Sequence, residues 1–322
     1  MDIDAIDAAA ARAAGQIRRT PMLTAPALDA MAGRRVLIKA ECLQHTGSFK
    51  ARGGWSAISA LSKAARSRGV IAYSSGNHAQ GVARAAAAMG APAVIVMPGD
   101  APKAKIDDTR MLGAEVVLYD RATEDRDAIG TDIAAARGLH LIKPFDDPLV
   151  IAGQGTTGLE IAEDAAGMGV TQADVLVCCG GGGFASGIAL ALDARAPGLR
   201  VRTAEPAGFD DMARSLVTGT PQTNAARSGG LCDAILTPRP GDLTFPILKR
   251  LAGPGLVVSD DDALRAMGLA FRHLNVVVEP GGAVALAAAL FHPDQIEGEA
   301  VICTLSGGNV DPAIFARALA TL

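Results

Sequence analysis

One lysine, Lys50, lies in a setting that suits covalent chemistry. It lies within the segment 46–54 (TGSFKARGG), at the start of a predicted helix, where its neighbours are Phe49 and several small residues. A lysine amine that such neighbours partly desolvate loses its proton more readily, and the neutral amine can form a Schiff base with a carbonyl compound. Because most lysines are solvated surface charges, Lys50 is a weak indication by itself. It predicts a catalytic amine only if other residues bind the carbonyl compound.

Three glycine-containing motifs each follow a short apolar run. They are residues 74–81 (SSGNHAQG), the tetraglycine at 180–183 and residues 306–309 (SGGN). In parallel α/β sheets, ligands bind beyond the carboxyl ends of the strands, so the three motifs are expected to meet at one edge. Together with Lys50 they offer side chains that could hold an aromatic ring, backbone N–H groups that could bind a phosphate, and a hydrogen-bond partner for a pyridine nitrogen. This combination predicts a site for pyridoxal 5'-phosphate.

The tetraglycine is the predicted phosphate site. Backbone N–H groups in this turn can surround a phosphate, and the following helix N-terminus adds a partial positive charge. A dinucleotide-binding turn would instead show the Gly-x-Gly-x-x-Gly spacing, with an acidic residue about twenty positions later. Four consecutive glycines fit a single phosphate better. The cup consists of Gly180, Gly181, Gly182 and Gly183.

The other two motifs offer polar side chains. Asn77 can hydrogen-bond a phenolic oxygen, and Ser306 can face a pyridine nitrogen and leave it unprotonated. Ser74 and Ser75 can bind a substrate carboxylate or carry protons. His78 fits a structural histidine that opens a helix as well as a catalytic one.

Carboxylates gather after a predicted strand, at Glu205, Asp210 and Asp211. Oxygen clusters of this kind bind hard divalent cations. A charged loop that caps the next helix explains the same spacing equally well.

Composition restricts the class of protein. The chain has 322 residues, of which 49% are hydrophobic and only 3% aromatic, so its core is expected to be aliphatic. That favours helices packed on parallel sheets. A net charge of −4 without a long basic tract argues against nucleic-acid binding. The apolar runs are too short to span a membrane, and the acidic residues 1–4 do not resemble a signal peptide. We therefore expect a cytoplasmic protein.

The five cysteines form no CxxC pair and are expected to be buried thiols in a reducing compartment. Cys178 and Cys179 should point to opposite faces of a strand, so they are poor partners for each other.

Short apolar runs alternate with Ala-rich helical stretches, which predicts a doubly wound α/β fold. The predicted strands are residues 36–41, 70–74, 93–97, 115–119, 140–142, 175–178, 200–204 and 300–305. The predicted helices include residues 78–89, 102–112, 124–136, 260–274 and 312–319.

Taken together, these motifs resemble the fold-type II pyridoxal-phosphate enzymes, specifically the serine/threonine dehydratase and serine racemase group. The resemblance extends nearly end to end and includes residues 19–21 (RTP), 150–156 (VIAGQGT) and 278–283 (VEPGGA). It implies an α/β fold of two domains with doubly wound sheets, like the tryptophan synthase β chain. The large cofactor-binding domain would comprise residues 1–68 and 147–322, and residues 69–146 would form a small mobile domain. It also implies a homodimer.

The resemblance assigns roles by matching position. Lys50 corresponds to the Schiff-base lysine that takes the Cα proton, and Ser75 to the serine that serves the opposite face in the racemases. It implies cofactor contacts by Phe49, Lys50, Asn77, Gly180, Gly181, Gly182, Gly183 and Ser306, and substrate contacts by Ser74, Ser75, His78 and Arg126. Glu205, the Phe209 carbonyl and Asp211 match a magnesium or calcium site. One departure, residues 231–234 (LCDA) where Ala-Asp-Gly is usual, leaves the substrate open.

The predicted reaction is elimination of water from a 3-hydroxy amino acid, which yields a 2-oxo acid and ammonia. L-threonine and L-serine are the default substrates. Arg126 motivates 3-hydroxyaspartate as an alternative, and Ser75 motivates serine racemisation. The bland interpretation, a solvated arginine on a helix surface, is preferred for Arg126 from the sequence. A non-enzymatic phosphate- or nucleotide-binding protein is the remaining alternative. Such a protein would need none of Lys50, Asn77 and Ser306.

Overall fold

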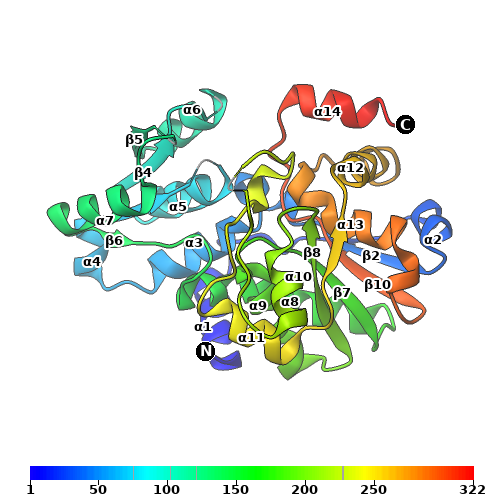
Figure 1. Ribbon diagram of the computed structural model, residues 1–322. Helices are drawn as coiled ribbons and strands as arrows, with labels where there is room; N and C mark the ends of the chain where they lie inside the picture. The colour runs from blue at the N-terminus through cyan, green and yellow to red at the C-terminus, as the bar shows by residue number, and fades with distance from the viewer. Residues whose placement is uncertain (75, 102, 121, 227) are drawn as a thin grey trace.

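The chain folds around two separate sheets, which lie on opposite sides of the molecule in the computed structural model (Figure 1). The structure describes residues 1–74, 76–101, 103–120, 122–226 and 228–322. Six strands form the larger sheet, in the order β1-β2-β10-β7-β8-β9, and four form the smaller one, in the order β5-β4-β3-β6. The protein is therefore of the α/β class, as the alternation of apolar runs and helical stretches predicts.

The larger sheet is parallel except at one edge. Strand β1 pairs with β2 in antiparallel orientation, while β2, β10, β7, β8 and β9 run parallel. Its strands are β1 (Met22–Leu23), β2 (Arg35–Lys39), β7 (Ala173–Cys178), β8 (Leu199–Pro206), β9 (Leu256–Val258) and β10 (Ala300–Thr304). Strands β1 and β9 were not predicted from the sequence, because runs of two and three residues show no periodicity.

Alternate residues of these strands enter different cores. Cys178 belongs to the core under helices α12 and α13, and Cys179 belongs to the core under α8 and α9. The predicted opposite orientation of these two cysteines is confirmed, and all five cysteines are free and buried. The helices around this sheet are α1 (Ile3–Ala13), α2 (Pro26–Ala32), α3 (Lys50–Ser59), α8 (Pro148–Gly167), α9 (Gly183–Arg195), α10 (Asp211–Thr218), α11 (Thr244–Leu251), α12 (Asp260–Leu274), α13 (Pro280–Phe291) and α14 (Pro312–Leu319).

The smaller sheet is wholly parallel. Its strands are β3 (Val70–Tyr73), β4 (Ala93–Pro98), β5 (Glu115–Tyr119) and β6 (His140–Leu141), and its helices are α4 (Lys63–Arg68), α5 (Asn77–Ala88), α6 (Lys103–Met111) and α7 (Arg126–Arg137). All of these elements except α4 lie within residues 69–146, and the division into a large domain and a small mobile domain stays a prediction. Short 3-10 turns complete the fold at Glu41–Leu43, His45–Gly47, Asp233–Ile235 and Pro293–Gln295.

Helix α7 begins two residues later than predicted. The Asp125 side chain accepts the N–H groups of Asp127 and Ala128, so Asp125 caps the helix and Arg126 becomes its first residue. Arg126 therefore lies at the N-terminus of the helix, with 42% of its side chain exposed.

Helix α3 packs against α5 through backbone contacts. A Cβ atom on Gly54 would lie 2.7 Å from the Gly81 carbonyl oxygen, and one on Gly81 would lie 2.7 Å from the Lys50 carbonyl oxygen. Only glycine fits at both positions. The close approach brings Lys50, at the start of α3, next to the helix that carries Asn77.

Candidate active site

A cavity between the two sheets brings together most of the predicted site residues. The predicted residues that line it are Phe49, Lys50, Ser74, Asn77, His78, Arg126, Gly180, Gly181, Gly182 and Gly183. They come from α3, from the loop after β3, from α5 and α7 in the small domain, and from the turn between β7 and α9. Ser75, predicted to act on one face of the substrate, lies outside the described residues.

Lys50 presents its amine to this cavity without an acidic partner. Its Nζ donates to the Pro144 carbonyl oxygen at 2.5 Å and lies 5.2 Å from the centroid of the Phe49 ring. Within the described parts of the chain, no ion pair involves this amine. Burial lowers the pKa of Lys50 from 10.5 to about 8. A substantial fraction of the amine is therefore neutral near neutral pH, as nucleophilic attack requires.

The tetraglycine turn leaves no room for side chains. A Cβ on Gly181 would lie 2.3 Å from the Phe145 ring, and one on Gly183 would lie 2.8 Å from the Phe145 carbonyl oxygen. Gly182 has φ +92°, a conformation that residues with a Cβ rarely adopt. Helix α9 starts at Gly183, so its N-terminal N–H groups face the cavity. This geometry suits a phosphate.

Asn77 is fixed in orientation by two neighbours. Its Nδ2 donates to Glu279 Oε1 at 2.5 Å, and its Oδ1 accepts from Asn309 Nδ2 at 2.7 Å. The amide carries a second N–H, which can be donated to a ligand in the cavity. Burial raises the pKa of Glu279 to about 7. Glu279 was not assigned a role from the sequence, although its place before Pro-Gly-Gly at the start of α13 was a usable signal.

Ser306 lies behind the wall of the cavity and does not line it in this structure. Its carbonyl oxygen accepts the N–H of Phe49 at 3.1 Å, and its side chain lies beside the Cys178 thiol, which does line the cavity. The Phe49 ring stacks on the Phe184 ring at 4.0 Å between centroids. Ser306 is therefore close to the predicted ring site, and its role toward a pyridine nitrogen stays a prediction.

His78 is neutral and anchored. Burial, with a contribution from the Lys50 charge, lowers the pKa of His78 to about 3. Its Nε2 lies 3.1 Å from the Ile142 carbonyl oxygen, so this nitrogen carries the proton. Its Nδ1 is buried with no hydrogen-bond partner among the described residues. These contacts join α5 to the end of β6, while the ring still borders the cavity.

Two further cations border the cavity besides Lys50. Arg126 reaches it from the first turn of α7, and Lys105 reaches it from α6. Lys105 Nζ would lie 3.6 Å from a Cβ on Gly76, at the N-terminus of α5. Asp233 and Glu279 are the acidic residues in the lining. Arg126 was predicted from the sequence but Lys105 was missed, since one lysine in an amphipathic helix gives no signal of its direction.

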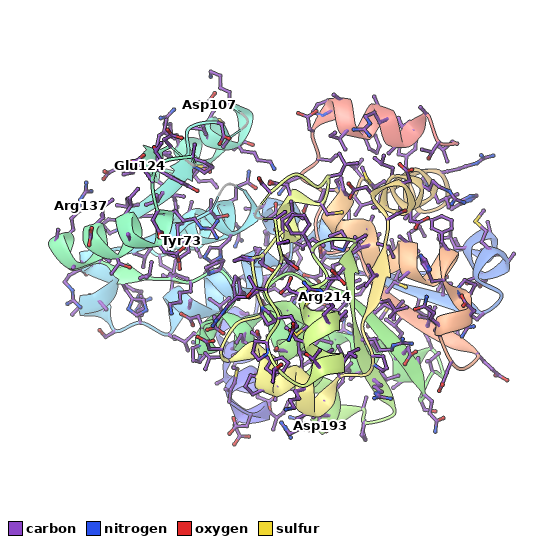
Figure 2. The ribbon with its side chains drawn as sticks, viewed as in Figure 1. Tyr73, Asp107, Glu124, Arg137, Asp193 and Arg214 are labelled. Carbon is purple, nitrogen blue, oxygen red and sulfur yellow. The ribbon has the colours of Figure 1, made fainter. Side chains whose placement is uncertain are left out.

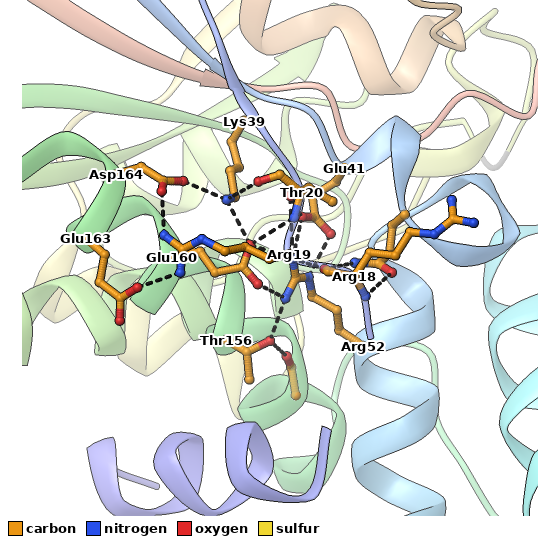
Figure 3. Close-up of polar contacts among 12 residues, drawn as sticks. Arg18, Arg19, Thr20, Lys39, Glu41, Arg52, Thr156, Glu160, Glu163 and Asp164 are labelled. Carbon is orange, nitrogen blue, oxygen red and sulfur yellow. Dashed lines mark hydrogen bonds and ion pairs between the residues drawn. The ribbon is translucent and has the colours of Figure 1, made fainter. Parts of the chain in front are cut away.

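A cluster of buried ion pairs lies on the other side of α3 (Figure 3). The Arg52 guanidinium contacts both oxygens of Glu41, at 2.8 and 2.7 Å, and both oxygens of Glu160, at 2.7 and 2.9 Å. Lys39, which is fully buried, binds Glu160 at 2.8 Å and Asp164 at 2.9 Å. Burial opposes these charges, but the paired acids raise the pKa of Arg52 well above its usual range.

The predicted metal residues are not part of the cavity lining, and the helix-capping interpretation of Glu205 is confirmed, while the metal site stays a prediction. Glu205 is on strand β8, not in a loop, and its carboxylate accepts the N–H groups of Met212 and Ala213 at 2.9 and 2.8 Å. It therefore caps α10. Asp211 Oδ2 is buried and has no hydrogen-bond partner among the residues that the structure describes. Burial raises the pKa of Glu205 well above its usual range and that of Asp211 to about 6. Within the described chain, no group of three His, Cys, Asp or Glu side chains could hold a metal.

Comparison with known proteins identifies the family. Residues 13–308 match the family described as pyridoxal-phosphate dependent enzyme. The chain belongs to this family. It is similar to the L-threo-3-hydroxyaspartate ammonia-lyase of Pseudomonas sp, with 43% identity over 97% of this chain and 96% of that protein. It is also 38% identical to the serine racemase of Oryza sativa subsp. indica, over 99% of this chain and 94% of that one.

Solved structures agree with this assignment. The T.th. threonine deaminase has a TM-score of 0.91 and 44% identity, covering 97% of this chain and 99% of that one. Maize serine racemase also has a TM-score of 0.91, with 36% identity, and the match covers 99% of this chain and 97% of that one. The protein is thus an enzyme of the fold-type II pyridoxal-phosphate class. The cavity fits this cofactor, because it combines an amine that has no acidic partner among the described residues with a turn of glycines at the N-terminus of α9. In the described part of the chain, no helix combines the length and the apolar composition needed to cross a membrane.

Proposed function

We propose that this enzyme eliminates water from a 3-hydroxy amino acid and releases a 2-oxo acid and ammonia. The observation that carries the proposal is the Lys50 amine, which has a pKa of about 8 and faces the same cavity as the glycine cradle and Asn77. When bound, pyridoxal phosphate supplies an aldehyde for the substrate amine and an electron sink for the carbanion at Cα. The residues of the chain then decide which bonds break.

Lys50 acts as the base. Its neutral amine accepts the Cα proton of the substrate, and its hydrogen bond to the Pro144 carbonyl oxygen holds the nitrogen at the cavity wall. The glycine cradle would hold the phosphate through backbone N–H groups. Asn77 would donate its second amide N–H to the ring oxygen, while Glu279 and Asn309 would keep the amide in this orientation. Ser306 would face the ring nitrogen, and Ser74 and His78 would border the bound substrate.

The proposed elimination is balanced in atoms and electrons and needs no external oxidant. Loss of the Cα proton and of the β-hydroxyl as water leaves an enamine, which takes up water and releases ammonia to give the 2-oxo acid. We assign Ser75 to the opposite face of the substrate. Ser75→Ala is expected to abolish any racemisation and to leave elimination from the L-substrate intact. Retained racemisation in this variant would exclude Ser75 as the second base.

L-threonine and L-serine are the default substrates, and 3-hydroxyaspartate is a second candidate. Arg126 and Lys105 place two positive charges in the cavity lining in addition to Lys50. A substrate with a second carboxylate would use one of them, since arginine binds carboxylates through two parallel hydrogen bonds. The Pseudomonas relative named for 3-hydroxyaspartate is consistent with this candidate.

The test is release of 2-oxo acid by the purified, cofactor-loaded enzyme. The panel comprises L- and D-serine, L- and D-threonine and the isomers of 3-hydroxyaspartate, with Lys50→Ala as the control. Turnover that depends on Lys50 supports the proposal, and the preferred substrate decides between the two candidates. If the loaded enzyme releases no 2-oxo acid from any of them, the proposed reaction is wrong.

We also propose a magnesium or calcium ion bound by Glu205, the Phe209 carbonyl and Asp211. Two buried carboxylates with raised pKa and one unpartnered oxygen would be stabilised by a cation, which would hold β8 against α10. Millimolar Mg²⁺ or Ca²⁺ should raise the Tm of the wild type but not of Asp211→Asn. Equal Tm values with and without either ion would argue against the site.

We further propose a cytoplasmic homodimer that binds a small amino-acid substrate and neither nucleic acid nor membrane. Sedimentation equilibrium at micromolar concentration would test the dimer. A monomer mass would reject it.

A further inference from the structure

Tyr73 occupies the last position of β3, directly before Ser74, and it lines the cavity that contains Lys50. The residue is buried, with 7% of its surface exposed. Figure 2 labels it beside the ribbon of α7. A tyrosine at this position can contact both the substrate region and the first turn of that helix.

Three residues of α7 surround the Tyr73 ring. The guanidinium carbon of Arg126 lies 5.6 Å from the ring centroid, within the range of a cation–π contact. The Asp127 carboxylate lies beside the Tyr73 hydroxyl. A Cβ on Gly130 would lie 2.9 Å from Tyr73 Cδ1, so the helix approaches the ring closely because this residue is glycine. The first turn of α7 is therefore fitted to this one side chain.

This arrangement restricts a side chain that would otherwise move freely. Arg126 is 42% exposed, and its Nε lies 3.6 Å from Asp127 Oδ2. An exposed ion pair at this distance holds an arginine weakly. The ring supplies a second contact from the cavity side. With Nε turned to Asp127, the two terminal nitrogens of the guanidinium are the natural binding site for a carboxylate.

We propose that Tyr73 is the positioning residue that makes Arg126 a selector for substrates with a second carboxylate. The inference rests on the proposed function, since it names the substrate class of the same cavity. Tyr73 touches neither the cofactor nor the reacting atoms in this role. It holds the guanidinium at the cavity wall, next to the loop that begins at Ser74, so that the arginine loses less freedom when the carboxylate binds.

The experiment compares selectivity in matched variants of the holoenzyme. Tyr73→Leu removes the ring and Tyr73→Phe keeps it. Tyr119→Leu is the control, because Tyr119 is the only other tyrosine in the chain, is similarly buried at the end of β5, and is not among the residues that line the cavity with Lys50. The readout is kcat/KM for L-threo-3-hydroxyaspartate divided by kcat/KM for L-threonine. Tyr73→Leu should lower this ratio about tenfold, mainly through KM for the dicarboxylate.

Tyr73→Phe should keep the ratio within about twofold of the wild type, because the cation–π contact remains. Tyr119→Leu should leave it unchanged. An unchanged ratio in Tyr73→Leu overturns the proposal. So does an equal loss on both substrates, since that pattern indicates a purely structural role. If Tyr73→Leu does not fold, Tyr73→Met, which also lacks a ring, replaces it.

A binding measurement separates this inference from the proposed reaction. Succinate has the two carboxylates of the dicarboxylic candidate but no amine to react, and butyrate has only one carboxylate. Titration calorimetry of the holoenzyme should show that succinate binds more tightly than butyrate. The Kd for succinate should be about tenfold higher in Tyr73→Leu and unchanged in Tyr119→Leu. If the wild type shows this binding pattern but releases no 2-oxo acid, the proposed reaction is wrong and the inference about Tyr73 stands. Equal Kd values for succinate and butyrate in the wild type overturn the inference, even if threonine is a good substrate.

Discussion

Lys50 and Arg52 lie two residues apart on helix α3, and the protein treats their charges in opposite ways. Arg52 is 2% exposed and has two carboxylates against its guanidinium, each held by two contacts (Figure 3). Lys50 has a carbonyl oxygen and an aromatic ring but no carboxylate partner in the described structure. Burial raises the cost of both charges, yet only one of them is compensated.

The difference separates Arg52, whose charge holds the fold together, from Lys50, whose amine is proposed to take part in the reaction. Paired acids keep Arg52 charged and tie α3 to Glu41, after β2, and to Glu160 on α8. Without such a pair, burial moves the pKa of Lys50 toward neutrality. The helix that carries the proposed catalytic amine is therefore fixed by Arg52, two residues further along. Changes at these residues and at the cradle would test this contrast, from the largest expected effect to the smallest.

Replacement of Lys50 by alanine should abolish turnover and covalent attachment of the cofactor. The fold should persist, because the amine makes no ion pair within the described chain. Absorbance of the bound cofactor and circular dichroism would be measured on the same sample. A Lys50→Ala protein that still turns over substrate would contradict the assignment of the base.

Replacing Arg52 and Lys50 in turn by methionine should have different effects on the free energy of unfolding. Arg52→Met leaves the fully buried Glu41 without its partner and should lower the free energy of unfolding by about 3–5 kcal/mol. Lys50→Met removes an uncompensated charge and should change it by less than about 1 kcal/mol. Urea unfolding would be followed for both proteins without cofactor, so that cofactor binding does not contribute. Equal losses would show that the ion pairs do not fix α3. Arg52→Lys, which keeps the charge but loses the paired contacts, should lie between the two.

The phosphate cradle should respond to one methyl group. Gly181→Ala places a Cβ 2.3 Å from the Phe145 ring and should weaken cofactor binding by about tenfold. Gly167→Ala, at the end of α8 with nothing within 4 Å of the added Cβ, is the control and should bind normally. The dissociation constant from fluorescence titration would measure both. Normal binding by Gly181→Ala would mean that the turn adapts and is not a fixed cradle.

The rate of cofactor attachment to the apoprotein should follow the Lys50 amine. With a pKa of about 8, the amine is protonated below that pH and neutral above it, so the rate should rise roughly fiftyfold from pH 6 to 8 and then level off. Stopped-flow absorbance would record it. An ordinary lysine would give a rate that keeps rising about tenfold per pH unit up to about pH 10. That outcome would show that the Lys50 amine has the pKa of a solvated lysine, and that its lack of an acidic partner does not make it more reactive.

An exposed ion pair provides the lower limit of the comparison. Arg195 and Asp7 lie 2.6 Å apart, with 50% and 42% of their side chains exposed. Arg195→Ala should lower the free energy of unfolding by less than about 1 kcal/mol, because solvent screens the pair. A loss as large as that of Arg52→Met would show that burial does not decide the value of these pairs.

Much of the fold and of the site could be predicted from the sequence, because local chemistry carries those signals. Eight of the ten strands in the described part of the chain follow from apolar runs, and the glycine turns mark where strands end. The short strands β1 and β9 could not be predicted, since only pairing with β2 and β8 makes them strands. Glu279 and Lys105 were not assigned to the site, because the direction in which a side chain points depends on how its helix packs.

The sequence by itself determined the α/β class and the family, and it predicted the catalytic amine and the phosphate cradle, because each depends on residue types at short, fixed spacings. Only the tertiary structure decided which charges are compensated. Arg52 meets Glu160 across 108 positions of the chain, and Asn77 meets Glu279 across 202. It likewise set Tyr73 against Arg126, which are far apart along the chain. Pairing and desolvation at such separations depend on packing, and packing is a property of the whole fold and not of any segment.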